Sequence, residues 1–175
     1  AGDASDAPRP VAFQRKGRWH DGRLLAPRAG GPARLGAYLD DHAFLADAIL
    51  ELASVRFDAT ELRFGIELLE TMLRHFGDPA GGFHFTADDH ETLISRPRSW
   101  GDDALPAGNG VAAFALQRYG YLLGEPRYVA AAEGTLRAAW HTLREQPQHH
   151  VTLLLALEEL LQPPQIVILR GARKA

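Results

Sequence analysis

The chain has 175 residues, of which 46% are hydrophobic and 23% charged, a balance typical of one soluble globular domain. It contains no cysteine, which excludes disulfides, thiolate metal sites, cysteine nucleophiles and CxxC redox chemistry. Its formal net charge of -3 lacks the basic excess that binding to a phosphate backbone requires, so we expect no nucleic-acid partner.

The sequence also lacks segments that would enter a membrane or direct export. No uninterrupted apolar run of about 18 residues is present. Ala1–Pro10 has no apolar core of the length that a secretory signal requires. We therefore expect a cytoplasmic protein with no membrane partner. Neither a GxSxG, a P-loop nor a dinucleotide-binding motif appears, so we expect no cofactor.

The first 36 residues are rich in Gly, Pro, Arg and Ala, with few apolar clusters. This composition predicts irregular covering structure. Within it, Asp21-Gly22 is a favoured two-residue turn, which favours a short β-hairpin between Arg18-Trp19 and Arg23-Leu24-Leu25.

From Tyr38 onward, apolar residues recur at steps of three and four, the period of one face of a helix. The first and third of the helices predicted in this way are apolar on several sides, whereas the second and fourth carry more charge. This difference indicates an inner and an outer layer. The pattern predicts five helices, over residues 38–57, 59–76, 109–123, 127–144 and 150–161.

The segment between the second and third helices has a different period. Phe83 and Phe85 alternate with polar neighbours, which predicts a short β-hairpin turned at Ala87–His90 and followed by a long loop. The tail Gln165–Leu169 also has the composition of a β-strand. We therefore divide the chain into an irregular N-terminal segment, a helical-hairpin array and an extended tail, at residues 1–36, 37–162 and 163–175.

The helices contain an internal repeat. An offset of 66 positions pairs Ala46 with Ala112 and Leu50 with Leu116, so two copies of one helical hairpin fit the spacing. Stacked hairpins bury their faces on neighbours, and such an array is expected to continue or to close. The fifth helix would begin a third copy. A plain helical bundle with chance periodicity is the alternative.

Several motifs occur in the order typical of one family. They read Tyr-Leu-Asp-Asp-His-Ala-Phe at 38–44, Gly-Gly-Phe-His-Phe-Thr at 81–86, Leu-Ile-Ser-Arg-Pro-Arg at 93–98, Leu-Pro-Ala-Gly-Asn-Gly-Val-Ala-Ala at 105–113 and Gln-Ile-Val-Ile at 165–168. Over about residues 36–171 the chain resembles the C-terminal portion of the thioredoxin-domain-containing proteins related to spermatogenesis-associated protein 20.

The resemblance implies a portion of an (α/α)6 toroid, similar to N-acylglucosamine 2-epimerase and the six-hairpin glycosidases. We therefore expect an all-α fold, a partial toroid-like array of helical hairpins with a small β-hairpin insertion. The chain would form about half of such a toroid. The family places a thioredoxin-like domain before it, but no CxxC is present here, so redox activity is not implied for this chain.

Two carboxylates open the first inner helix. Asp40 and Asp41 could cap the helix, because carboxylates accept hydrogen bonds from free N–H groups at a helix N-terminus. The resemblance implies instead that the ends of the inner helices line a substrate pocket. Asp41 would then be a general acid or base, and Asp40 would share the catalytic site and hold substrate hydroxyls. The residues alone leave both interpretations open.

The second inner helix begins with an equivalent group of residues. Asn109 is either an N-cap or a substrate ligand, and Trp100 could stack on a sugar ring. Arg96 and Asp102 lie in the same long loop and either bind substrate or form an ion pair that fastens the loop. The family pattern Asp-Gly-Ala-x-Pro-Ser-Gly-Asn-Ser reads Asp-Asp-Ala-Leu-Pro-Ala-Gly-Asn-Gly at 102–110, without either serine hydroxyl.

A cluster of possible metal ligands lies in the predicted hairpin, at His84, Asp88, Asp89, His90 and Glu91. Strand alternation places His84 on the face opposite Phe83 and Phe85, and the four other residues have the composition of a solvated turn. We therefore predict no metal site.

Two functions fit these observations. The first is a carbohydrate-binding or carbohydrate-processing site of six-hairpin type, with a sugar-like small molecule as ligand. The second is a non-enzymatic structural or interaction module that supports a missing thioredoxin-like domain, or that pairs with a second copy or a missing toroid half. The second predicts an exposed apolar face, because inner helices need partners.

Overall fold

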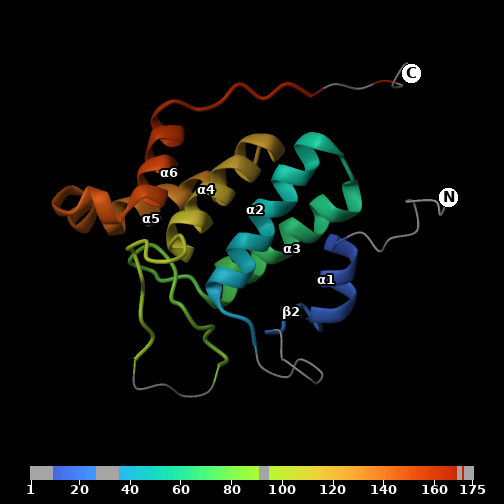
Figure 1. The fold of residues 1–175 in the computed structure, drawn as a ribbon, viewed down its shortest axis with the longest axis horizontal. Coiled ribbons are helices and arrows are strands. Elements are labelled where there is room, and N and C mark those ends of the chain that lie inside the picture. The colour runs from blue at the N-terminus through green and yellow to red at the C-terminus, as the bar shows by residue number, and fades with distance from the viewer. Residues whose placement is uncertain (1–9, 27–35, 91–94, 169–170, 172–175) are drawn as a thin grey trace.

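The computed structural model describes residues 10–26, 36–90, 95–168 and 171, and the architecture is mostly helical, which confirms the all-α class (Figure 1). The elements are α1 Pro10–Arg18, β1 Trp19–His20, β2 Arg23–Leu24, α2 Leu39–Val55, α3 Ala59–His75, α4 Gly108–Leu123, α5 Pro126–Glu145, the 3-10 helix η2 Pro147–His149, and α6 Val151–Leu161.

The N-terminal segment differs in part from its expectation. The prediction of irregular structure is wrong over α1, a nine-residue helix that buries Val11 alone and so has little apolar periodicity. The β-hairpin is confirmed: β1 and β2 pair antiparallel, with Trp19 opposite Leu24. Asp21 and Gly22 form its turn with φ values of 51° and 74°, the left-handed region that this tight turn requires. Residues 1–9 and 27–35 lie outside the described part.

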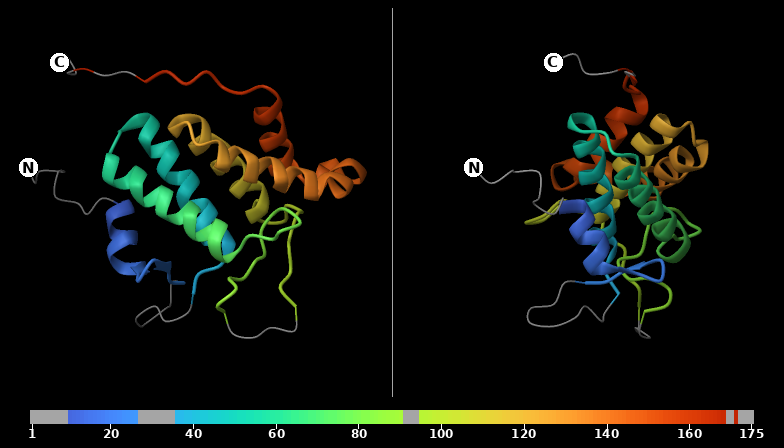
Figure 2. Two further views of the ribbon diagram at one scale, coloured as in Figure 1. Left: turned by 180° about the vertical axis from the view of Figure 1, so that it is seen from behind. Right: turned by 90° about the vertical axis from the view of Figure 1, so that its right-hand side faces the viewer.

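Helices α2, α4 and α6 pack side by side, while α3 covers α2 and α5 covers α4 (Figures 1 and 2). The three inner helices run in the same direction, because the carboxylate of Asp40 touches Gly108 and Thr152 touches Gly110 at their N-terminal ends. The order inner, outer, inner, outer, inner is the layering that the repeat predicts.

One close approach holds the two layers together. Tyr119 of α4 is fully buried, and its hydroxyl donates a hydrogen bond to the Ala46 carbonyl of α2 at 3.1 Å. The same hydroxyl fills the space where a side chain at Gly65 of α3 would begin. A glycine is therefore required at this point, because a methyl group there would displace the buried phenol.

The predicted β-hairpin between α3 and α4 is absent from the described residues of that connection. Gly77 and Phe83 form an isolated bridge, and Gly81 and Gly82, with φ values of 95° and 79°, lie in the tight turn between them. Residues 91–94, which follow the predicted turn, lie outside the described residues. The tail is also not a strand over 165–168, where it is exposed and has no described neighbouring strand.

Within the described ranges, no helix combines the length and the apolar composition needed to cross a membrane.

A buried histidine lies near the start of α2. The side chain of His42 is fully buried, with Nδ1 2.8 Å from the Tyr38 carbonyl and the ring 4.9 Å from that of Phe76. Its Nε2 has no hydrogen-bond partner among the described residues. Burial lowers the pKa of His42 from 6.5 to about 4, so the ring is neutral in the folded protein at pH 7.

This pKa predicts a loss of stability in acid. Between pH 6.5 and 4 the unfolded chain binds a proton at this ring that the folded chain does not bind, so the free energy of unfolding decreases as the pH falls. Between pH 7 and 4.5 we expect the histidine to account for about 2 to 3 kcal/mol of this decrease. Urea unfolding at the two pH values measures it.

Two variants separate this effect from other titrations. His42→Asn should reduce the pH dependence by that amount, and His141→Asn, at an exposed position on α5, is the control for replacing a histidine by asparagine. Equal pH dependence in wild type and His42→Asn would show that the buried ring is not responsible.

Candidate functional site

The predicted site residues gather where the inner helices begin. The Cα atom of Gly108, the first residue of α4, packs against the carboxylate of Asp40 on α2. The Cα atom of Gly110 packs against Thr152 at the start of α6. A Cβ at either glycine would collide with these neighbours, so the small residues allow three helix N-termini to converge. The connection from α3 to α4 reaches the same place.

Asn109 fastens that connection to α4. Its side chain is 1% exposed, with Oδ1 accepting a hydrogen bond from Phe83 N at 2.8 Å. Its Nδ2 donates to the carbonyls of Phe83 at 2.8 Å and Ser99 at 3.0 Å. Asn109 is not the N-cap, which is Ala107. Both of its donors are used, and the backbone of Phe83 bonds to this amide in place of a neighbouring strand.

Asp102 joins the starts of α4 and α6. One carboxylate oxygen accepts a hydrogen bond from Ala107 N, and the other accepts one from Thr152 N, both at 2.8 Å. Burial alone raises the pKa of Asp102, but hydrogen bonds from the backbone of Ala107, Thr152 and Val151 outweigh it, and the pKa is lowered. The carboxylate stays charged at the positive ends of two helix dipoles.

Arg96 binds backbone carbonyls at the C-terminal end of α3. Its guanidinium donates to the Thr86 carbonyl at 2.6 and 3.1 Å and to the His75 carbonyl, in the last turn of α3, at 3.0 Å. The expected ion pair between Arg96 and Asp102 is not among the described contacts. Each charge instead satisfies backbone groups at a helix end of opposite polarity, where it complements the helix dipole.

Trp100 supports the loop from its other side. It is half-buried against the core, and the Arg98 guanidinium lies 5.6 Å from its ring centroid. The indole contacts the Cα atom of Gly82, and a side chain there would collide with the ring. Stacking of Trp100 on a sugar remains a prediction.

The two adjacent aspartates have different surroundings. Asp41 accepts hydrogen bonds from Tyr38 N at 3.1 Å through Oδ2 and from the Arg18 guanidinium at 2.8 Å through Oδ1. Both of its oxygens are therefore engaged. Asp40 is half-buried, and no hydrogen bond from a described residue reaches its carboxylate. Burial and the neighbouring charge of Asp41 raise the pKa of Asp40.

A second polar group, missed in the sequence, lies on the face of the inner helices turned away from α3 and α5. We call this surface the inner face. Arg118 of α4 bonds to Glu51 of α2 at 2.8 Å and to Glu159 of α6 at 3.0 Å. Its guanidinium also lies 3.9 Å from the centroid of the Phe114 ring. One arginine thus connects all three inner helices.

Asp47 completes this inner face. Its Oδ1 is buried, and no described residue forms a hydrogen bond to it. Burial raises the pKa of Asp47, although the charge of Arg118 lowers it. Asp40, Asp47 and Glu51 follow one another along α2 at steps of seven and four, so they share a face of the helix. This spacing of acids on an otherwise apolar helix was the signal available in the sequence.

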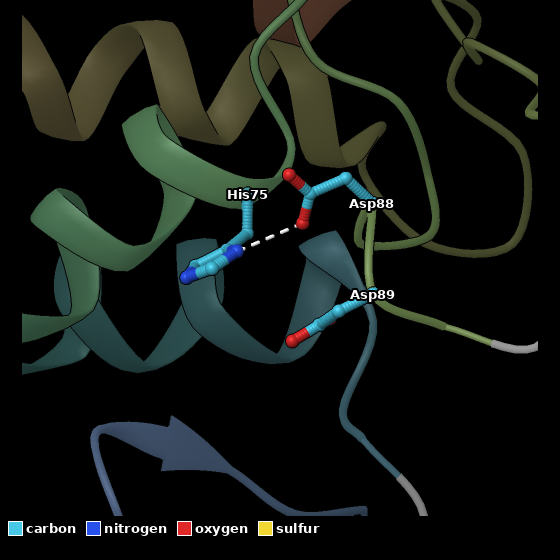
Figure 3. Close-up of side chains that lie close together, drawn as sticks. All are labelled: His75, Asp88 and Asp89. Atoms are coloured by element: carbon cyan, nitrogen blue, oxygen red, sulfur yellow. Dashed lines mark hydrogen bonds and ion pairs between the residues drawn. The ribbon is translucent and has the colours of Figure 1, made fainter.

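The metal-capable cluster has a different composition from the expected one. His75, Asp88 and Asp89 bring their ligating atoms within 4.8 Å of one another, with His75 Nδ1 2.8 Å from Asp88 (Figure 3). Asp89 accepts two hydrogen bonds from Arg23, both at 2.7 Å, so a guanidinium already holds this carboxylate. His84 binds elsewhere, to Asp78 at 3.0 Å. Glu91 lies outside the described residues.

The role of Asp102 predicts a stability effect. Asp102→Ala removes the acceptor for two helix N-termini, so we expect the free energy of unfolding to fall by roughly 1 to 3 kcal/mol. Asp103→Ala, at the adjacent exposed position, should change it by less than about 0.5 kcal/mol. Urea unfolding at pH 7 measures both, and equal effects would contradict the bridging role.

Comparison with known proteins finds a distant relationship. Spermatogenesis-associated protein 20 of Homo sapiens is 25% identical over 140 residues, which cover 79% of this chain and 18% of that protein. The Mus musculus protein of the same name is 28% identical over 136 residues, covering 75% of this chain and 17% of that protein. No protein-family model matches the chain. The chain is thus distantly homologous to spermatogenesis-associated protein 20 and spans less than a fifth of the length of these relatives.

Proposed function

We propose that the chain is a non-enzymatic structural module, a portion of an (α/α)6 toroid that associates with further helical hairpins. This proposal rests on the groups to which the candidate side chains bond. Asp41, Asp102, Asn109 and Arg96 all bond to the backbone at helix ends or in the connecting loop. A catalytic residue needs a free atom that reaches the substrate, and these residues are engaged in holding the fold.

The packing order supports the toroid part of the proposal. Inner and outer helices alternate along the chain, and α6 takes the place of an inner helix for which no outer helix follows among the described residues. In an array of stacked hairpins each unit covers its neighbour, so a further hairpin packed on α6 would cover its exposed residues Val151, Leu155 and Leu161.

A sugar-like ligand on the inner face is the second candidate function. Asp40 favours it, because this carboxyl is half-buried, accepts no described hydrogen bond and has a raised pKa, as a general acid requires. The aromatic ring of Phe114 would supply a surface for stacking on the inner face, and the carboxylates there would accept hydrogen bonds from hydroxyl groups. Trp100, in the connection to α4, would supply a second ring.

Titration with a panel of neutral and acidic monosaccharides, followed by amide chemical shifts, separates the two functions. The structural module predicts no saturable shift at up to about 10 mM sugar, the upper end of weak specific binding. Saturable shifts at Asp40, Asp47 and Phe114 that disappear in Asp40→Asn would support the sugar site instead.

The raised pKa of Asp40 adds a prediction on stability. Because folding disfavours the charged carboxyl, Asp40→Asn should leave the free energy of unfolding at pH 7 unchanged or increase it. Asp41→Asn should decrease it, since the ion pair with Arg18 is lost. Urea unfolding of both variants decides the matter, and a destabilised Asp40→Asn would reveal a structural role for this carboxylate.

A further inference from the structure

One histidine and two aspartates converge at the C-terminal end of α3. His75 lies in the last turn of α3, and Asp88 and Asp89 lie in the connection to α4. Their ligating atoms all lie within 4.8 Å of one another, and the three side chains turn toward a common space (Figure 3). The sequence grouped these aspartates with His84, which is nearer along the chain. The fold brings in His75 instead, 13 positions before Asp88.

The backbone holds two of these side chains at a fixed spacing. Asp88 N donates a hydrogen bond to the His75 carbonyl at 2.8 Å, and the Arg96 guanidinium donates to the same carbonyl at 3.0 Å. His75 Nδ1 and Asp88 Oδ1 are 2.8 Å apart. Two ligands that share one ion through bonds of about 2.0 to 2.2 Å lie about 3 to 3.5 Å apart. A small rotation of the exposed Asp88 side chain therefore gives the spacing of shared coordination.

Asp89 has acceptor positions for an ion although Arg23 binds it. The guanidinium of Arg23 donates one hydrogen bond to each carboxylate oxygen, both at 2.7 Å. An ionised carboxylate has about four acceptor positions, so about two remain. Carboxylates that bind metal ions commonly accept hydrogen bonds of this kind, which fix their orientation. Two carboxylates next to one guanidinium also leave an excess of negative charge, which attracts a cation.

We propose that His75, Asp88 and Asp89 bind one divalent transition metal ion of the zinc class. An imidazole nitrogen combined with carboxylate oxygens suits such an ion, whereas calcium and magnesium prefer oxygen ligands alone. The Asp88 and Asp89 side chains are 53% and 54% exposed, so an ion can reach them from solvent. Three protein ligands leave a coordination position for water. The site lies outside the inner face and does not rest on the proposed structural module.

Calorimetric titration of the metal-free full chain with zinc chloride at neutral pH tests the proposal. We expect one saturable site with a dissociation constant below about 100 μM. His75→Gln, Asp88→Asn and Asp89→Asn should each raise this constant at least about tenfold, because even residues that only support a metal ligand contribute that much. Calcium chloride in about a hundredfold excess over zinc should not displace it, since calcium gains little from an imidazole nitrogen.

Helix α5 offers a matched control. His141 and Glu145 form another exposed histidine–carboxylate pair, with His141 Nδ1 3.5 Å from Glu145 Oε2. His141→Gln should leave the zinc affinity unchanged. Weaker binding in this variant would place the ion on α5 and overturn the proposed site. Circular dichroism of each variant checks that its helices are retained.

Cobalt locates the ion without a substitution. Co²⁺ accepts the same nitrogen and oxygen ligands as zinc and is paramagnetic, so it shifts and broadens the amide resonances of nearby residues. We expect the amides of His75, Asp88 and Asp89 to respond first and zinc to reverse the effect. A response spread over many surface carboxylates, or zinc binding that survives the three substitutions, would show an adventitious ion only. Either result, or no saturable binding up to about 1 mM zinc, overturns the proposal.

Discussion

The helical array depends on the convergence of three helix N-termini at the start of α4. Free N–H groups at a helix N-terminus need acceptors, and close packing of several such ends concentrates positive dipole ends in one place. Asp102 meets both requirements, because its two oxygens accept hydrogen bonds from Ala107 and Thr152 and its charge faces both dipoles. Gly108 and Gly110 allow the helices to approach closely enough for this single carboxylate to reach both.

The aspartates near these helix N-termini fall into two groups, those that accept hydrogen bonds within the fold and those that do not. Asp41 and Asp102 accept hydrogen bonds and belong to the framework. Asp40 and Asp47 lie on the inner face with raised pKa values caused mainly by burial, so folding acts against their ionised forms. A framework that needed only caps would not require these two acids. The inner face, with Arg118 connecting three helices, is the surface on which the second candidate function places a sugar-like ligand.

The ends of the array connect the fold to the proposed association. A hairpin repeat buries each inner helix against neighbouring inner helices. Within the described residues, α4 has an inner helix on both sides, whereas α2 and α6 each have one, which is α4. Leucine and valine side chains are exposed on these two outer helix sides. The layered order of the helices thus leaves these two helix sides open to the further hairpins that the proposed module would bind.

The sequence by itself determined the helices of the array, because apolar periodicity and local signals such as the Asp58 cap and the Asp21-Gly22 turn act over a few residues. It failed for α1, which buries too little apolar surface to show a period. Only the tertiary structure decided the roles of the site residues. Asn109 bonds to a residue 26 positions away and Asp102 to one 50 positions away, which no local pattern encodes. These side chains bond to distant backbone groups because a buried N–H or carbonyl group left without a partner costs more free energy than a ligand site left empty.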